Sequence, residues 1–109
     1  MKKYLLFLVF FALVPAGAAW AADQPTFELT LHNHAFSPAT LTIPANKQVK
    51  LTVKNLDNTP AEFESHDFHA EQVVAGGSQT ILYIGPLSPG TYGFFDDFHD
   101  STEGKLLVK

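Results

Sequence analysis

The sequence predicts an all-β fold, a Greek-key β-sandwich, from three observations. Short segments in which apolar and polar residues alternate recur along the chain, and this period of two is typical of half-buried strands. Turn residues separate the segments roughly every eight to twelve residues, as in small β-sandwiches. No window carries a helical stripe of apolar residues, and the 109-residue chain shows no internal repeat and no sign of a second domain.

The clearest predicted strand covers residues 48–55. Val49, Leu51 and Val53 face one side of it, and the lysine and threonine residues between them face the other. The same pattern predicts strands at residues 26–31, 40–43, 62–65 continuing into 71–74, 80–84, 91–95 and 105–108. Clusters of turn residues lie between them, for example at 44–46, 57–60 and 75–78. About seven strands are therefore expected.

The first 21 residues match a secretory signal peptide. Lys2 and Lys3 form a basic start, residues 4–14 are apolar, and the small side chains of Ala19 and Ala21 suit a signal peptidase. A transmembrane anchor, the alternative, would need about 20 apolar residues. We therefore expect a cleaved signal peptide at 1–21, a folded domain at 22–109, and a location in the periplasm of a Gram-negative bacterium.

The charge and the residue types after position 21 limit the partners of the domain. Five lysines, no arginine and eleven acidic residues give a net charge near −6. This charge argues against nucleic acid and anionic membranes as partners. It is compatible with a bound cation, with a basic protein partner, or simply with solubility. The chain has no cysteine, so its stability has to come from packing rather than from disulfides.

Several stretches of the chain resemble cupredoxins. They are FSP at 36–38, LTIPA at 41–45, AGGS at 75–78, GPL at 85–87 and PGTYGFF at 89–95. Together with EFES at 62–65 and FDDFH at 95–99, they are most similar to the EfeO-type cupredoxin-like domains, small periplasmic proteins encoded beside bacterial iron permeases. The resemblance covers nearly all of residues 22–109. It implies a cupredoxin-like sandwich that binds iron, or helps to oxidise it, for a membrane permease.

The chain departs from the cupredoxin pattern at the copper ligands. A blue-copper site uses two histidines, one cysteine and a weakly bound methionine. On the cupredoxin pattern Cys-x-x-His-x-x-Met, Asp96 stands at the cysteine, His99 at the second histidine and Thr102 at the methionine, while Ala61 stands at the upstream histidine. Because the thiolate is missing, a blue type-1 copper site is excluded.

The loop at residues 96–99 is the main candidate metal site. Asp96, Asp97 and His99 put carboxylate and imidazole donors where the cupredoxin ligands would be, and such donors suit iron, copper(II), zinc or manganese. Hard oxygen donors favour iron over copper(I). The alternative is that Asp96 or Asp97 caps backbone amides of the loop, as aspartate commonly does in turns.

Two more candidate ligands lie on or just after the predicted strand at 62–65. Strand alternation would put Glu62, Glu64 and His66 on one face while Phe63 packs inward. Glu64 and His66 are therefore expected additions to the metal site. The alternative is that these polar groups only form the solvated face of the sheet.

His34 is the last candidate ligand. In a cupredoxin-like topology the first loop lies at the same end of the sandwich as the loop that carries His99. His34 could therefore reach His99. The alternative is a histidine that caps a turn or is half buried.

These observations lead to one expected function and two alternatives. The expected cofactor is a metal ion, iron or copper, and the resemblance implies a membrane iron permease or a periplasmic iron-uptake protein as the partner of a monomer. The alternatives are a metal-free interaction module that docks to a permease or periplasmic partner, and a copper or zinc carrier with a histidine and carboxylate site. No nucleophile motif is present, so no catalytic residue is predicted, and enzymatic activity is left open.

Overall fold

The computed structural model describes residues 24–109, so the signal peptide expected at 1–21 lies outside the described residues. Residues 24–109 form strands and turns without a helix, and therefore contain no helix that could cross a membrane. The strands are β1 (Thr26–His32), β2 (Ala35–Ser37), β3 (Thr40–Ile43), β4 (Val49–Asn55), β5 (Ala61–Ser65), β6 (Ala70–Val74), β7 (Gln79–Ile84), β8 (Gly90–Asp96) and β9 (His99–Val108).

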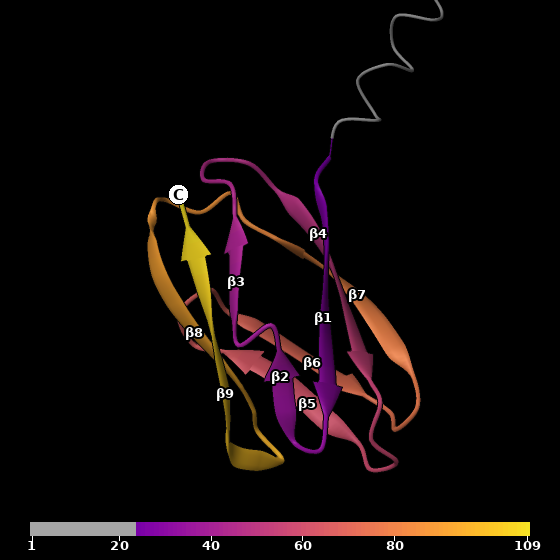
Figure 1. Cartoon of the computed structure of the whole chain (residues 1–109). Helices are drawn as coiled ribbons and strands as arrows, with labels where there is room; N and C mark the ends of the chain where they lie inside the picture. Colours follow the sequence, from indigo (N-terminus) through magenta and orange to yellow (C-terminus); the bar gives the residue numbers. More distant parts are fainter. Residues whose placement is uncertain (1–23) are drawn as a thin grey trace, which may run out of the picture.

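The strands form two sheets that pack face to face (Figure 1). Sheet A has the strand order β2-β1-β4-β7, and sheet B has the order β3-β9-β8-β5-β6. The pairs β1–β4 and β3–β9 are parallel, and the remaining neighbours are antiparallel. The predicted all-β sandwich is confirmed.

Strand β4 shows why the alternating pattern predicts the sheets. Val49, Leu51 and Val53 point into the sandwich and are almost fully buried, while the residues between them are partly exposed on the outer face. Burial of one such side chain contributes about 1.5–3 kcal/mol. A shift of one residue in register would expose all three, so the pattern also fixes the register.

The number of strands differs from the prediction, because the structure has nine instead of about seven. The segments 62–65 and 71–74, predicted as one strand, are the antiparallel pair β5–β6, and a turn at 66–69 separates them. The three-residue strand β2 was not predicted. Strand β9 begins at His99 rather than at residue 105, because its first half pairs with β8.

Aromatic side chains fill the core between the two sheets. The ring of Phe63 lies 5.2 Å from that of Phe94 and 6.2 Å from that of Phe36, and all three are buried. Gly104 of β9 lies directly across from Phe94. A Cβ atom at position 104 would overlap the Phe94 ring and come within 3.2 Å of the carbonyl oxygen of Ala39.

Gly104→Ala is therefore expected to destabilise the protein by about 1–3 kcal/mol through overpacking. The matched control is Gly93→Ala on the adjacent strand, where the new Cβ would meet only Asp67 Oδ2 at 3.6 Å, an ordinary contact. Urea unfolding of both variants measures the difference. Equal unfolding midpoints for the two variants would contradict this account of the core.

Three connections come together at one end of the sandwich, the lower end in Figure 1. They are the β1–β2 turn at 33–34, the β4–β5 loop at 56–60 and the β8–β9 turn at 97–98. Each follows a strand that runs toward that end. Side chains far apart in the sequence can therefore meet there.

Candidate metal centre

Asp96 is the most buried polar residue at this end of the sandwich, with none of its surface exposed. Its Oδ1 atom accepts hydrogen bonds from the backbone N–H of Glu62, at 2.9 Å, and of Phe98, at 3.0 Å. Asp96 is thus a backbone cap, as the alternative interpretation predicted. Its second oxygen, Oδ2, lies 3.0 Å from Nδ1 of His99. This contact is a hydrogen bond in which one proton is shared between the two side chains.

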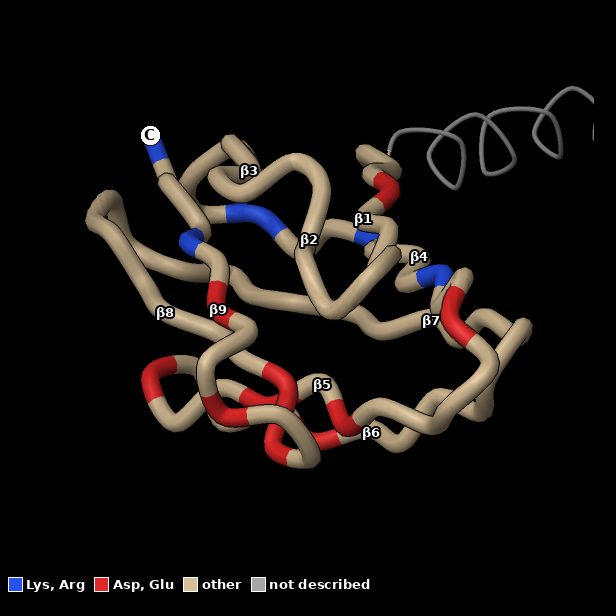
Figure 2. Tube along the Cα trace, turned by 60° about the horizontal axis from the view of Figure 1, so that its bottom comes forward, with Lys and Arg blue, Asp and Glu red and all other residues tan. Residues whose placement is uncertain are grey.

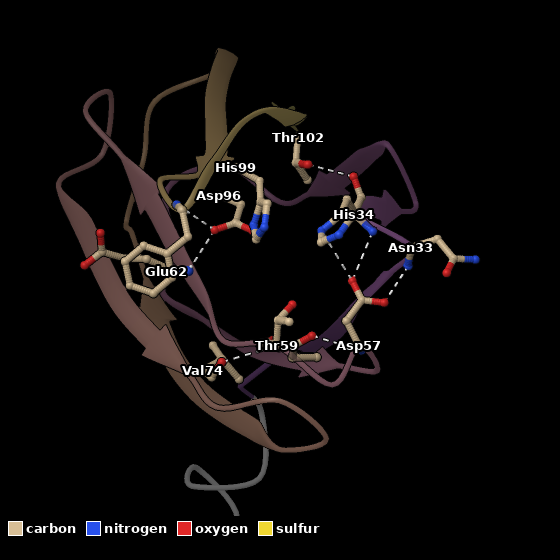
Figure 3. A network of polar contacts seen from close by, with 11 residues as sticks. Asn33, His34, Asp57, Thr59, Glu62, Val74, Asp96, His99 and Thr102 are labelled. Atoms are coloured by element: carbon tan, nitrogen blue, oxygen red, sulfur yellow. Dashed lines mark hydrogen bonds and ion pairs between the residues drawn. The ribbon is translucent and has the colours of Figure 1, made fainter.

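The imidazole rings of His99 and His34 lie against each other. Their centroids are 4.2 Å apart and the ring planes are inclined by 36°. His99 begins β9, whereas His34 belongs to the β1–β2 turn, so the expected approach of these two residues is confirmed. Figure 3 shows both rings turned toward the same space, with Asp96 beside His99. Both side chains remain accessible from solvent, with exposed fractions of 50% for His34 and 35% for His99.

The turn that carries His34 has an uncommon backbone conformation. Asn33 and His34 have φ angles of 52° and 58°, and they connect paired strands whose last residues are His32 and Ala35. A two-residue hairpin turn with positive φ at both positions favours glycine at the second position, because a Cβ atom is strained there. The chain nevertheless has a histidine at this position.

Asp57 and Thr102 bind the backbone of this turn. The Asp57 carboxylate accepts the N–H of Asn33 at 2.6 Å and the N–H of His34 at 3.0 Å. The hydroxyl of Thr102 donates to the carbonyl oxygen of His34 at 2.7 Å. The hydrogen bond from the backbone of His34 lowers the pKa of Asp57, which therefore stays ionised. Sequence reasoning missed both residues as part of the site, although Asp57 stands in a predicted turn and Thr102 at the cupredoxin methionine position.

Asp97, Glu64 and His66, the other predicted ligands, lie elsewhere. Carboxylate oxygens of Glu62, Glu64 and Asp97 come within 4.8 Å of one another, and Nδ1 of His66 lies 3.6 Å from an oxygen of Glu64. This second group is on the outer face of sheet B. In Figure 3 the Glu62 carboxylate points away from the histidines, and Figure 2 shows acidic residues gathered around β5, β6 and the start of β9.

The six predicted ligands therefore form two groups instead of one. Asp96 pairs with the buried Phe63 across β5 and β8, whereas Glu64 pairs with Phe95. Because neighbouring residues of a strand point to opposite faces, Asp96 faces the interior and Glu64 faces outward. Only His34, Asp96 and His99 come together at the end of the sandwich.

The outer-face group makes stability dependent on pH. Burial raises the pKa of Glu62 from 4.5 to about 7, and a hydrogen bond to Asp97 and the charges of Glu71 and Glu64 add to the effect. Between these two pH values the folded protein keeps a proton that the unfolded chain has lost. Stability contributed by this proton is complete below the unfolded pKa and is lost as the pH rises through about 7.

Glu62→Gln should remove this dependence, because the amide keeps the shape of the side chain without a charge. The variant is expected to melt at a higher temperature than the wild type at pH 8, and at the same temperature at pH 4. Melting curves recorded across this pH range test the prediction. Parallel pH profiles for the two proteins would show that Glu62 does not carry the effect.

The residues at the cupredoxin ligand positions do not fit type-1 copper. The chain has no cysteine, and Ala61 at the upstream histidine position is buried without a donor atom. The donors that are present fit a cation that accepts nitrogen and oxygen. With metal–ligand distances near 2.0–2.2 Å, two ligands at a right angle are about 2.9 Å apart. Nδ1 of His99 and Oδ2 of Asp96 are 3.0 Å apart, so they could hold one ion together.

A two-sheet sandwich whose strand β9 begins with a histidine beside the buried end of β8 has the architecture of the cupredoxin class. The chain belongs to the Cupredoxin-like domain family, whose profile matches residues 4–108. It is 37% identical over 82 residues to the uncharacterized protein RP394 of Rickettsia prowazekii. That match covers 74% of this chain and 66% of the relative, just under two thirds of its length.

Solved structures of similar fold include proteins that are named as cupredoxins or copper-binding domains. A purple cupredoxin from Nitrosopumilus maritimus matches with a TM-score of 0.59 and 21% identity, over 75% of this chain and 98% of that one. The metal-binding domain of the Cu(I)-exporting ATPase CopA from Streptococcus pneumoniae matches with a TM-score of 0.67 and 12% identity, over 77% and 84%. At these identities the likeness establishes the fold alone.

Proposed function

We propose that this chain is an exported binding protein for a divalent transition-metal ion, held by His34, Asp96 and His99. The observation that carries the proposal is the contact of two imidazole rings from distant parts of the chain, 4.2 Å apart, beside a fully buried carboxylate. Two histidines and one carboxylate are the donor set of many non-haem Fe(II) sites. Fe(II) is therefore the ion that we propose.

The hydrogen bond between Asp96 and His99 supports a site in which a metal ion replaces a proton. In the metal-free protein, one proton lies between Nδ1 of His99 and Oδ2 of Asp96 at 3.0 Å. A cation that takes this position keeps both atoms at nearly the same separation. Only a neutral imidazole whose proton sits on Nε2 can bind through Nδ1, and acid protonates both ring nitrogens, so binding is expected to weaken in acid.

The biological setting is part of the proposal. A signal peptide at 1–21 would deliver the domain to the periplasm, and the resemblance to EfeO-type domains supports a membrane iron permease as the protein that receives the ion. The iron is then cargo, bound one ion per chain by a monomer. Oxidation of the ion would require an electron acceptor, so binding without turnover is the function that we propose.

Melting curves of the purified domain test the metal site. Fe(II) under anaerobic conditions, at one hundred times its Kd, should stabilise the native state by about 2.7 kcal/mol. For a domain of this size that corresponds to a rise in Tm of about 11–22 °C. His66→Ala on the outer face is the control that keeps the rise. If Fe(II), Cu(II) and Zn(II) all leave the Tm unchanged, the metal site is rejected in favour of a metal-free docking module.

Copper is the second candidate cargo. The same three side chains suit Cu(II), and two proteins of similar fold are named for copper or as cupredoxins. Affinities for Cu(II) generally exceed those for Fe(II), so bare affinity does not decide between the two. Deletion of the gene distinguishes the two ions in cells. A loss of growth on limiting iron would support iron as the cargo, and a loss of copper tolerance would support copper.

A further inference from the structure

We infer that Asp57 and Thr102 are positioning residues that hold His34 against His99. The inference rests on the proposed metal site, because it explains how one of the two imidazoles is kept in place. Neither residue is a proposed ligand. Both bind the backbone of His34, and Oδ2 of Asp57 also lies 3.8 Å from Nδ1 of its ring.

The conformation of the β1–β2 turn creates the need for such residues. The φ angles of 52° at Asn33 and 58° at His34 lie in the left-handed region, which asparagine and histidine adopt more often than other side chains but at a cost that only glycine avoids. Left to itself, a turn with histidine at this position would often adopt other conformations. The surrounding structure therefore has to impose the observed one, and strain of this kind is found at functional sites.

Asp57 imposes this conformation from the β4–β5 loop. Its two oxygens accept the two successive N–H groups of the turn, at 2.6 and 3.0 Å, and its side chain is only 12% exposed. Asp57 is itself fixed, because its N–H donates to Oδ1 of Asn55 at 3.1 Å. Asn55 is buried and donates to the carbonyl oxygens of Thr59 and Val74. Hydrogen bonds thus link the turn to both sheets.

Thr102 fixes the other side of the turn. Its hydroxyl donates to the carbonyl oxygen of His34 at 2.7 Å, and only 3% of the residue is exposed. Thr102 belongs to β9, the strand that His99 begins. One strand therefore carries one imidazole as a side chain and holds the backbone of the other. Strand β9 therefore contributes to the position of both rings.

Thr102→Val and Asp57→Asn test the inference, because each removes one of these contacts and changes the shape of the side chain little. In both variants the metal-free protein should lose the nuclear Overhauser contacts between the ring protons of His34 and His99. Affinity for Fe(II) or Cu(II) should fall about 10–100-fold, as for other residues that orient ligands. Pulsed EPR of the Cu(II) form should count one coordinated imidazole where the wild type has two.

Two matched variants separate positioning from a general structural effect. Thr102→Ser keeps the hydroxyl and should keep the ring contacts, the affinity and two imidazoles. Asp67→Asn weakens a comparable bond, from the N–H of Gly93 to the carboxylate at 2.7 Å, away from the site, and should leave all three readouts unchanged.

The inference is wrong if folded Thr102→Val and Asp57→Asn proteins keep the ring contacts, or if they lose them while affinity and imidazole count stay at the wild-type values. If the wild type binds no metal, the proposed function fails. The ring contacts of the metal-free variants then still decide whether Asp57 and Thr102 position His34.

Discussion

His99→Ala should abolish the rise in melting temperature that metal produces and lower the affinity at least about 100-fold. Removal of groups that only orient a ligand typically costs 10–100-fold, and loss of the ligand itself should cost more. His34→Ala should have a similar effect, because its ring lies 4.2 Å from that of His99. In either variant, Asp96 and one remaining histidine would have to hold the ion.

Calorimetric titration of the wild type and the two alanine variants measures these affinities. His66→Ala serves as the control, since that residue lies next to Glu64 on the outer face of sheet B and not at the end of the sandwich. The account fails if His66→Ala weakens binding as strongly as His99→Ala, because the ion would then be held by the outer-face carboxylates.

Asp96→Cys should turn the copper form of this protein from pale to intensely coloured. Asp96 stands at the cupredoxin cysteine position. Its Oδ1 accepts the backbone N–H groups of Glu62 and Phe98, and its Oδ2 is hydrogen-bonded to Nδ1 of His99. A thiolate at this point, with His99 and His34, would give the two-histidine, one-cysteine set of blue-copper sites. Thiolate-to-copper charge transfer then absorbs strongly in the visible range, which nitrogen and oxygen ligands cannot reproduce.

Further substitutions identify the second histidine of that engineered site. Asp96→Cys combined with His34→Ala should lose the colour, because Ala61 offers no donor at the upstream histidine position. Adding Ala61→His to this double variant should restore it. Visible absorption spectra with one equivalent of Cu(II) are sufficient. Full colour in the double variant without Ala61→His would show that His34 does not reach the metal.

Most of the fold could be predicted from the sequence, because burial in a sandwich imposes a period of two on each strand. Strand β4 is an example, because only one register buries Val49, Leu51 and Val53 together. The β5–β6 pair was predicted as one strand because alternation alone does not show where a chain reverses. The turn at 66–69 contains no glycine or proline, and its single turn residue, Asp67, was not enough to mark it.

The candidate site was less predictable, because it depends on which face of a strand each side chain takes. Asp96 and Asp97 are adjacent in the sequence, yet one is buried beside His99 and the other joins Glu62 and Glu64 outside. Alternation places neighbours on opposite faces, but it could not show which of the two is buried before the register of β8 against β5 was known. The roles of Asp57 and Thr102 were also hidden, since both act by hydrogen bonds to the backbone of a residue distant in the chain.

The most direct test of the site is a paramagnetic NMR titration of the wild-type domain, with the ring protons of its five histidines as reporters. As Fe(II) or Cu(II) is added up to one equivalent, the signals of His34 and His99 should broaden first and together while that of His69 persists. Broadening of His66 before the other histidines, or equal broadening of all five, would show that no ion is held between His34 and His99.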